Sequence, residues 1–152
     1  IVALPYVLDR IRLTAPAAQV KRKGNACVTL DGRSPPGQGI AMRIYKILRA
    51  AEWADLDAQG ETRGAPIDIT DGFIHFSTAE QVAETAARHF AGQDGLILAA
   101  FEADRLGTAL VWEPSRGGAL FPHLYGPLRR ADVLWHAPLP LQGGAHVFPA
   151  DL

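Results

Sequence analysis

Cysteine is nearly absent from this chain: Cys27 is the only one in 152 residues. A single cysteine excludes an internal disulfide framework and a zinc site built from cysteines. No apolar run approaches the ~20 residues that a membrane-spanning helix needs. Residues 1–13 also lack the basic start and the ~7–15-residue apolar core of a signal peptide. These absences favour a reducing, cytoplasmic environment and no membrane partner.

An excess of charge of one sign is missing as well. Lys plus Arg number 15 and Asp plus Glu number 16, which gives a net charge of −1. A globally basic surface for nucleic acid is therefore not expected. Hydrophobic residues make up 48% of the chain and charged residues 20%. This composition is typical of a globular protein and excludes a disordered chain.

The charge is unevenly distributed along the chain. Residues 1–41 hold six basic and two acidic residues (net +4), and residues 42–152 hold nine and fourteen (net −5). Residues 14–41 are dense in Gly, Pro and Ser, without a period that favours strand or helix. The basic run Lys21–Lys23 fits an arm for phosphates or an anionic surface. The alternatives are a flexible extension or a reading frame that begins upstream of a true start at Met42. We expect residues 14–41 to pack poorly on a single domain over 42–152.

From Met42 onward the sequence pattern becomes regular. Alternating, β-branched and continuous apolar segments predict five strands, over residues 43–48, 72–76, 96–101, 109–113 and 133–139. Two helices are predicted, over residues 50–58 and from a capping box of Ser77 and Glu80 to Phe90. Residues 60–71 are predicted to form a loop, with a short extended piece over 67–69.

The ratio of strands to helices indicates the fold class. Two helices for five strands argue against a doubly wound parallel sheet. We therefore predict an α+β fold with a mostly antiparallel, strongly bent sheet and two flanking helices. The sequence contains no Walker, G-x-G-x-x-G, H-E-x-x-H or G-x-S-x-G motif. No pair of His or Cys has the short spacing of metal ligands, so no metal is expected.

Three polar residues near strands are candidates for function. Lys46 interrupts the first strand, either as a solvent-exposed lysine or as a cation aimed at phosphate. His75 lies within GFIHFST, either as a satisfied core residue or as an imidazole that contacts a substrate hydroxyl. Ser77 serves as a helix N-cap, and the same helix start offers free N–H groups to an anion.

Two further candidates lie in the second half of the chain. Glu113 ends the strand ALVWE, either as a placed catalytic acid or as a partner of Arg116 across the turn. Because side chains alternate along a strand, we expect Trp112 in the core and Glu113 toward a cleft. The run Phe121–Gly126 (FPHLYG) is predicted to be a loop whose aromatic residues cover apolar surface. Its candidate contact residues are Phe121, His123 and Tyr125.

The segments GFIHFST, VWE and LFPHLYGPL together resemble the bacterial family known as domain of unknown function 952. The resemblance runs from Met42 to about Leu139. Members of that family look like a small version of the ADP-ribosyltransferase fold, the broad class that includes RNA 2′-phosphotransferases. The resemblance therefore implies a split, strongly curved sheet with a cleft shaped for a nicotinamide dinucleotide.

The resemblance can be carried over residue by residue. Residues 45–47 match the opening strand motif of the family, which often reads Tyr-His-Ile, so Lys46 replaces a histidine here. His75 and Ser77 match the second motif, at the strand-to-helix junction where this fold class builds its cleft. Glu113 matches the position where transferases of the class often carry an acidic residue. Phe121–Gly126 matches the signature loop of the family.

These residues suggest three functions. In the first, an enzyme transfers or hydrolyses ADP-ribose from NAD: Glu113 stabilises charge on the ribose, and His75 orients a ribose hydroxyl. In that function Lys46 and the N–H groups after Ser77 hold the pyrophosphate, and Tyr125 or Phe121 stacks on a ring. The second is a non-catalytic module that binds a nucleotide or metabolite in the same cleft. The third is an RNA 2′-phosphotransferase-like enzyme, which the negative charge of residues 42–152 disfavours.

Candidate placement follows from the predicted strands. We expect Lys46 and His75 to face one cavity, because their strands are predicted to be neighbours in the sheet. We expect Phe121–Gly126 to line the mouth of that cavity, with His123 and Tyr125 on the same side.

Overall fold

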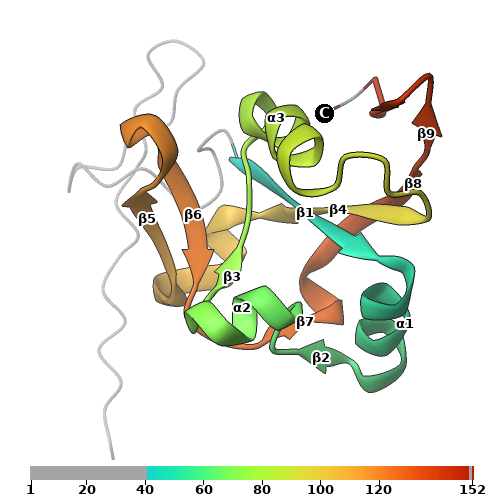
Figure 1. Cartoon of the computed structure of the whole chain (residues 1–152). Helices are drawn as coiled ribbons and strands as arrows, with labels where there is room; N and C mark the ends of the chain where they lie inside the picture. The colour runs from blue at the N-terminus through green and yellow to red at the C-terminus, as the bar shows by residue number, and fades with distance from the viewer. Residues whose placement is uncertain (1–40, 151) are drawn as a thin grey trace, which may run out of the picture. The chain divides into compact units, whose positions relative to one another are not determined.

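The computed structural model of the chain describes residues 41–150 and residue 152 (Figure 1). The expectations for the N-terminal segment, including its packing and the basic run Lys21–Lys23, concern residues outside this range, Ala41 excepted. In the described part of the chain, no helix is both long and apolar enough to cross a membrane.

The described residues form the following elements. The α-helices are α1 (Ala50–Gln59), α2 (Pro66–Asp71) and α3 (Ala79–His89). The longer strands are β1 (Arg43–Arg49), β4 (Leu96–Glu102), β5 (Leu110–Pro114), β6 (Leu120–Leu124) and β8 (Val133–Leu139). The two-residue strands are β2 (Glu61–Thr62), β3 (Ile74–His75), β7 (Leu128–Arg129), β9 (Leu141–Gln142) and β10 (Ala145–His146). Short 3-10 helices are η1 (Ala103–Ala109), η2 (Arg116–Gly118) and η3 (Arg130–Asp132).

The first sheet has β4 at its centre, between β1 and β8, and both pairings are antiparallel. Leu98, Ala99 and Phe101 of β4 are fully buried. A strand that is covered on both faces needs apolar residues at consecutive positions. The strand predicted over 96–101 from its continuous apolar run corresponds to this central strand.

The two faces of this sheet pack against different elements. Ile44 of β1 belongs to a core cluster that includes Leu56 of α1. Tyr45, on the opposite face, packs in a second cluster with Val82 and Ala86 of α3. Figure 1 shows α3 beside β1 and β4. Val82 and Ala86, which are four residues apart in sequence, mark the buried face of α3.

The second sheet has β6 at its centre, between β3 and β5. His75 of β3 lies opposite His123 of β6, and His123 lies opposite Val111 of β5. Residues directly opposite in an antiparallel pair share a face, as do alternate residues of one strand. Glu113 therefore shares the face of the two histidines, and Trp112 packs toward the core. This arrangement confirms that Trp112 and Glu113 point to opposite faces, but Glu113 is not among the residues that line the cavities described below.

A backbone bridge joins the two sheets. The N–H of Tyr45 donates to the C=O of Ser77 at 2.8 Å, and the N–H of Ser77 donates to the C=O of Tyr45 at 2.9 Å. The edge of β1 that does not pair with β4 therefore lies beside the segment that connects β3 to α3.

The predicted α+β class, with antiparallel sheets and few helices, is confirmed. The strand predicted over 72–76 is shorter than expected, and the helix predicted over 50–58 corresponds to α1. Gly60 ends α1 in the left-handed conformation, with φ of 79°. The described residues contain three α-helices rather than the two predicted.

The loop predicted over 60–71 is wrong in its second half, which forms α2. Pro66 is the first helical residue, where its missing N–H breaks no helical hydrogen bond. Asp68 accepts a backbone N–H in the first turn, and Gly72 ends the helix with φ of 84°. Ile67 is exposed, so α2 lacks the amphipathic period by which helices are found in sequences.

The start of α3 differs from the prediction by one residue. The N-cap is Thr78, and Oε1 of Gln81 accepts its N–H at 3.0 Å. Ser77 is not the N-cap: its backbone bonds to Tyr45, and its hydroxyl lies 3.0 Å from that of Thr85. Both adjacent hydroxyl residues are followed by Glu or Gln three residues on, so the capping-box pattern fits either. The bridge to β1 decides between them.

The loop predicted over 121–126 is for the most part strand β6. Pro122 favours a turn in a sequence because it has no N–H for a sheet. Here its C=O accepts the N–H of Phe76 at 3.0 Å, just beyond the end of β3. The missing N–H therefore costs one bond at the end of a short strand.

Candidate functional site

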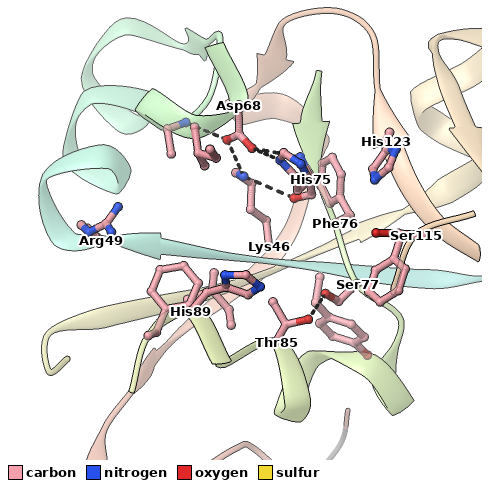
Figure 2. Close-up of a pocket in the computed structure, with 16 residues that line it drawn as sticks. Lys46, Arg49, Asp68, His75, Phe76, Ser77, Thr85, His89, Ser115 and His123 are labelled. Atoms are coloured by element: carbon pink, nitrogen blue, oxygen red, sulfur yellow. Dashed lines mark hydrogen bonds and ion pairs between the residues drawn. The ribbon is translucent and has the colours of Figure 1, made fainter. Parts of the chain in front are cut away.

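A cavity of about 310 Å³ opens beside β1, between α2, β3, α3 and β6 (Figure 2). It is lined by five of the predicted site residues: Lys46, His75, Ser77, Phe121 and His123. Lys46 and His75 both line this cavity, as predicted. The expectation that their strands are neighbours in one sheet is wrong, because β1 and β3 belong to different sheets. Of the signature run, Phe121 and His123 line this cavity, whereas Tyr125 lines a neighbouring one.

Asp68 lies at the centre of the polar contacts, although the sequence analysis did not select it. Its side chain is 1% exposed, and its Oδ2 lies 2.7 Å from Nζ of Lys46. Oδ1 lies 2.7 Å from Nδ1 of His75 and accepts the backbone N–H of His75 at 3.1 Å. Oδ2 also accepts the N–H of Ala65 at 2.7 Å. Both oxygens are engaged, so Asp68 fixes Lys46 and His75 relative to each other.

The pKa of Asp68 reflects this environment. Burial alone raises the pKa, but the hydrogen bond to His75 and the charge of Lys46 outweigh it. The pKa of Asp68 consequently lies far below its usual value. An ionised Asp68 compensates the buried charge of Lys46, which would otherwise be costly.

The ammonium of Lys46 has two acceptors within the described part of the chain, which leaves one of its hydrogens without a partner there. It donates to Asp68 and, at 3.3 Å, to the backbone C=O of His75. An ammonium carries three N–H donors. Because Lys46 lines the cavity, the third N–H is available to an oxygen of a ligand. Lys46 is therefore a fixed cation, 5% exposed, rather than a charge on a freely moving stem.

The ring of His75 lies between two carboxylates. Its Nδ1 faces Asp68, and its Nε2 lies 3.3 Å from Oδ2 of Asp71. In the imidazolium form both nitrogens donate, so this form has an acceptor on each side. The ring is 38% exposed and lines the cavity, where it can contact a ligand.

His123 is held by Glu113. Nδ1 of His123 lies 2.8 Å from Oε2 of Glu113, and the same oxygen accepts the Tyr125 hydroxyl at 3.0 Å. The bonds from His123 and Tyr125 lower the pKa of Glu113, and the bond to Glu113 raises the pKa of Tyr125. The alternative pairing of Glu113 with Arg116 concerns a side chain that lies outside the described part of the structure.

The second ring nitrogen of His123 is available. When Nδ1 donates to a carboxylate, Nε2 carries the lone pair of the neutral imidazole. Nε2 of His123 has no hydrogen-bond partner among the described residues, and the ring lines the cavity. His123 therefore combines a fixed orientation with a free basic nitrogen.

The ring of Phe73 contacts three other rings of the site. It stacks on that of His123 with centroids 4.2 Å apart and lies 4.8 Å from His75 and 5.3 Å from Tyr125. The two imidazoles are 5.3 Å apart in an edge arrangement. The register of β3 and β6 thus places two histidines, each bound to a carboxylate, at one cavity.

The free edge of β1 adds a backbone donor and acceptor. The N–H and C=O of Tyr45 bond to Ser77, away from β4. Because hydrogen-bonding direction alternates along a strand, the N–H and C=O of Ile47 point to the same free edge. Ile47 lines the cavity, and these two groups have no partner among the described residues. The cavity therefore offers an N–H and a C=O of one residue side by side.

Basic side chains outnumber carboxylates among the described residues that line the cavity, although Lys46 is paired with Asp68 and Arg49 with Glu52. Two permanent cations and three histidines line it, against one carboxylate among the described lining residues: Lys46, Arg49, His75, His89, His123 and Asp68. Such a cavity favours a ligand that carries negative charge. Within residues 41–150 and 152, no group of three His, Cys, Asp or Glu side chains is placed to hold a metal ion.

The comparison with protein families now adds an identification. The family model described as "Protein of unknown function (DUF952)" matches residues 47–136. The chain belongs to the DUF952 family. The resemblance seen in GFIHFST and LFPHLYGPL is thereby confirmed at the level of the family. A comparison with curated proteins found no match.

Solved structures of another protein are similar to this DUF952 chain. The crystal structure of protein CC0527 from Caulobacter crescentus is 52% identical, with a TM-score of 0.67, over 69% of this chain and 93% of that chain. A double mutant of CC0527 gives 51% identity and the same TM-score. The solution NMR structure of CC0527 gives 52% identity and a TM-score of 0.62, over 68% of this chain and 90% of that chain. These similarities support the small α+β fold of the DUF952 chain.

Three groups of the DUF952 site were missed by sequence reasoning. Asp68 could have been found as a helix N3 residue between Pro66 and Gly72, which is a start-and-stop signal for a short helix. Phe73 was not selected, because an apolar residue beside a strand does not by itself indicate contact with the histidines. The backbone of Ile47 has no signal in the sequence, because a free strand edge depends on sheet order.

Proposed function

We propose that this DUF952 protein binds NAD or another ADP-ribose-type ligand in the cavity beside β1 and transfers or hydrolyses the ADP-ribosyl group, on an ADP-ribosyltransferase-like fold. The observation that carries the proposal is the N–H and C=O of Ile47 in the cavity wall, which have no partner among residues 41–150 and 152. A primary carboxamide such as that of nicotinamide has one acceptor oxygen and an NH₂ donor. It complements both groups of Ile47 at once.

The charged residues of the cavity suit the rest of such a ligand. The third N–H of Lys46 would bind an oxygen of the phosphates or the ribose, and His75 would orient a ribose hydroxyl. Phe121, rather than Tyr125, would stack on a ring, because Phe121 lines this cavity. Ser77 would help to shape the wall of the cavity, where its hydroxyl contacts that of Thr85.

The reaction would proceed at the bond between ribose and nicotinamide. When this bond breaks, its electron pair leaves with nicotinamide and positive charge develops on the ribose. In hydrolysis, a water oxygen bonds to the ribose carbon and the water proton passes to Nε2 of His123. Glu113 would act by orienting His123 and by stabilising the imidazolium that forms. This positioning role replaces the direct contact with the ribose that the sequence suggested.

The ligand can be tested without changing the protein. Calorimetry with NAD, ADP-ribose, nicotinamide and nicotinic acid adenine dinucleotide should give binding of NAD and at least tenfold weaker binding of the acid form. The acid lacks the NH₂ donor and places a negative charge against the C=O of Ile47. Equal affinity for the amide and the acid would contradict the proposed role of Ile47. Absence of binding by all four compounds would overturn the proposed ligand class.

Catalysis needs a second measurement. His123→Asn should reduce the release of nicotinamide from NAD by roughly 10²–10⁴-fold, the usual range for loss of a general base. Affinity for NAD should change little. His136→Asn, a histidine outside the cavity, is the matched control and should leave turnover unchanged. If the wild-type protein binds NAD but releases no nicotinamide, it is a non-catalytic binding module.

A further inference from the structure

A second cavity lies next to the first, and the function proposed above does not involve it. It has a volume of about 360 Å³, and its walls include Arg63, Phe73, Tyr125 and Gly126. The signature run Phe121–Gly126 is therefore divided between the two cavities: Phe121 and His123 line the first, and residues 124–126 line this one.

The two cavities share one wall. Asp68 lines both of them. The ring of Phe73, in the second cavity, stacks on His123 of the first at 4.2 Å. Tyr125, also in the second cavity, bonds to the carboxylate that holds His123. A molecule anchored in the second cavity would therefore have to extend past Asp68, which lines both cavities, to place a reacting group beside the imidazoles of the first.

Arg63 gives the second cavity its chemical character. Its guanidinium has no hydrogen-bond or ion-pair partner among the described residues. Asp68 does not compete for it, because both carboxylate oxygens are already bonded to Lys46, Ala65 and His75. The Tyr125 hydroxyl donates to Glu113 and offers only its lone pairs. Among the described residues that line this cavity, the charge left uncompensated is the guanidinium of Arg63. Its planar fork matches a carboxylate or a phosphate.

We propose that the second cavity is the acceptor site of the transfer reaction, with Arg63 binding a phosphate or carboxylate of the acceptor. This inference rests on the proposed function. The bond between ribose and nicotinamide breaks, and its electron pair leaves with nicotinamide. A hydroxyl oxygen of the acceptor then bonds to the ribose carbon, and the hydroxyl proton passes to Nε2 of His123. The anion on Arg63 anchors the acceptor and does not react.

The binding claim can be tested with three small probes that differ in one group. Glycerol 3-phosphate and glycerate each carry hydroxyls and an anion, and glycerol carries hydroxyls only. In ¹⁵N-resolved NMR spectra of the full chain, either anionic probe should shift the amides of Phe73, Tyr125 and Gly126, and glycerol should not. The response of each anionic probe shows whether phosphate or carboxylate is preferred. Shifts confined to Ile47 and Ser77, or equal shifts with glycerol, would overturn the anion site.

Variants of Arg63 complete the binding test. Arg63→Ala should weaken binding of the preferred anionic probe roughly tenfold or more, because charge-assisted hydrogen bonds are lost. Arg63→Lys should lose part of the affinity, since it keeps the charge without the fork. Arg105→Ala, an exposed arginine outside both cavities, should have no effect. Unchanged affinity in Arg63→Ala would exclude Arg63 as the anchor.

The acceptor role has its own readout. With NAD and the preferred probe, Arg63→Ala should lower formation of ADP-ribosylated probe at least tenfold and leave the release of free ADP-ribose unchanged. Equal loss of both products, or no loss of either, would contradict an acceptor site. Failure of the wild-type protein to bind NAD would overturn the proposed function, and the NMR shifts would still decide whether the anion site exists.

Discussion

At the scale of single residues, the carboxylates of this site act through the groups that they hold. Glu113 lies on the same face of its sheet as His123 and bonds to Nδ1 of that ring and to the Tyr125 hydroxyl. Asp68 likewise bonds to Nδ1 of His75 and to the ammonium of Lys46. An imidazole whose Nδ1 is fixed by a carboxylate presents Nε2 in a defined direction and tautomer.

Glu113→Gln tests this positioning role. The amide cannot stabilise an imidazolium as a carboxylate does, so NAD turnover should fall roughly 10²–10³-fold. Affinity for NAD should change little, since Glu113 does not contact the ligand. Glu113→Asp should restore part of the activity, and Tyr125→Phe, which leaves the bond to His123 in place, should cost less. Steady-state kinetics and calorimetry on the same variants check this expectation. Wild-type turnover in Glu113→Gln would remove Glu113 from the mechanism.

At the scale of secondary structure, α2 is the element that places Asp68. Its six residues lie between glycines with positive φ, Gly64 at 97° and Gly72 at 84°. The two glycines differ in their surroundings. A methyl group on Gly64 would collide with the side chain of Asp68, whereas one on Gly72 would meet nothing within 4 Å. The site therefore requires glycine at position 64, because the backbone there lies close to the side chain of Asp68.

Alanine at each of these glycines separates backbone strain from the collision. Gly72→Ala should cost about 1–2 kcal/mol of folding free energy, the strain of a positive φ. Gly64→Ala should cost about 2 kcal/mol more, because Asp68 is displaced from buried partners. Only Gly64→Ala should also weaken NAD binding. Urea denaturation and calorimetry measure both effects, and equal losses of stability would show that Asp68 accommodates the methyl group.

At the scale of the domain formed by the described residues, the Lys46–Asp68 pair connects separate parts of the fold. It links β1 of the first sheet to α2, and Asp68 extends the link to β3 of the second sheet through His75. Lys46 and Asp68 are 22 residues apart in sequence. The cavity lies where these elements meet, so the same contacts support the fold and shape the site.

Asp68→Asn should show how this link depends on pH. Loss of the carboxylate leaves Lys46 as a buried charge without its counter-ion, and the free energy of unfolding should fall by about 3–5 kcal/mol near neutral pH. Because folding lowers the pKa of Asp68, its contribution is fully present above the unfolded value of about 3.9 and is lost as the pH falls below it. The difference between wild type and variant should therefore shrink in acid.

Denaturation curves between neutral and strongly acid pH provide the measurement. Asp71→Asn is the control, since Asp71 is 38% exposed and makes one contact of 3.3 Å with His75. It should change stability by less than about 0.5 kcal/mol. A wild-type advantage over Asp68→Asn that stays constant through the acid range would contradict the assigned pKa shift.

Local patterns in the sequence determined much of this architecture. The continuous run over 96–101 indicated a central strand, and the spacing of Val82 and Ala86 indicated the buried face of α3, because burial imposes a period on the residues that it covers. The alternation of side chains along β5 indicated that Glu113 and Trp112 point to opposite faces of the sheet. The motifs GFIHFST and LFPHLYGPL indicated the DUF952 family and selected His75 and His123.

Only the tertiary structure decided how these residues combine. Among the described strands β1 pairs only with β4, which leaves the N–H and C=O of Ile47 directed at the cavity. The register of β3 and β6 placed His75 opposite His123. Helix α2, most of whose residues are exposed, positions the buried Asp68 beside Lys46. These contacts join residues far apart in the chain, and their geometry depends on which strands pair and which edge stays open. Local periodicity reports whether a residue is buried, but it carries no information about the partner that buries it.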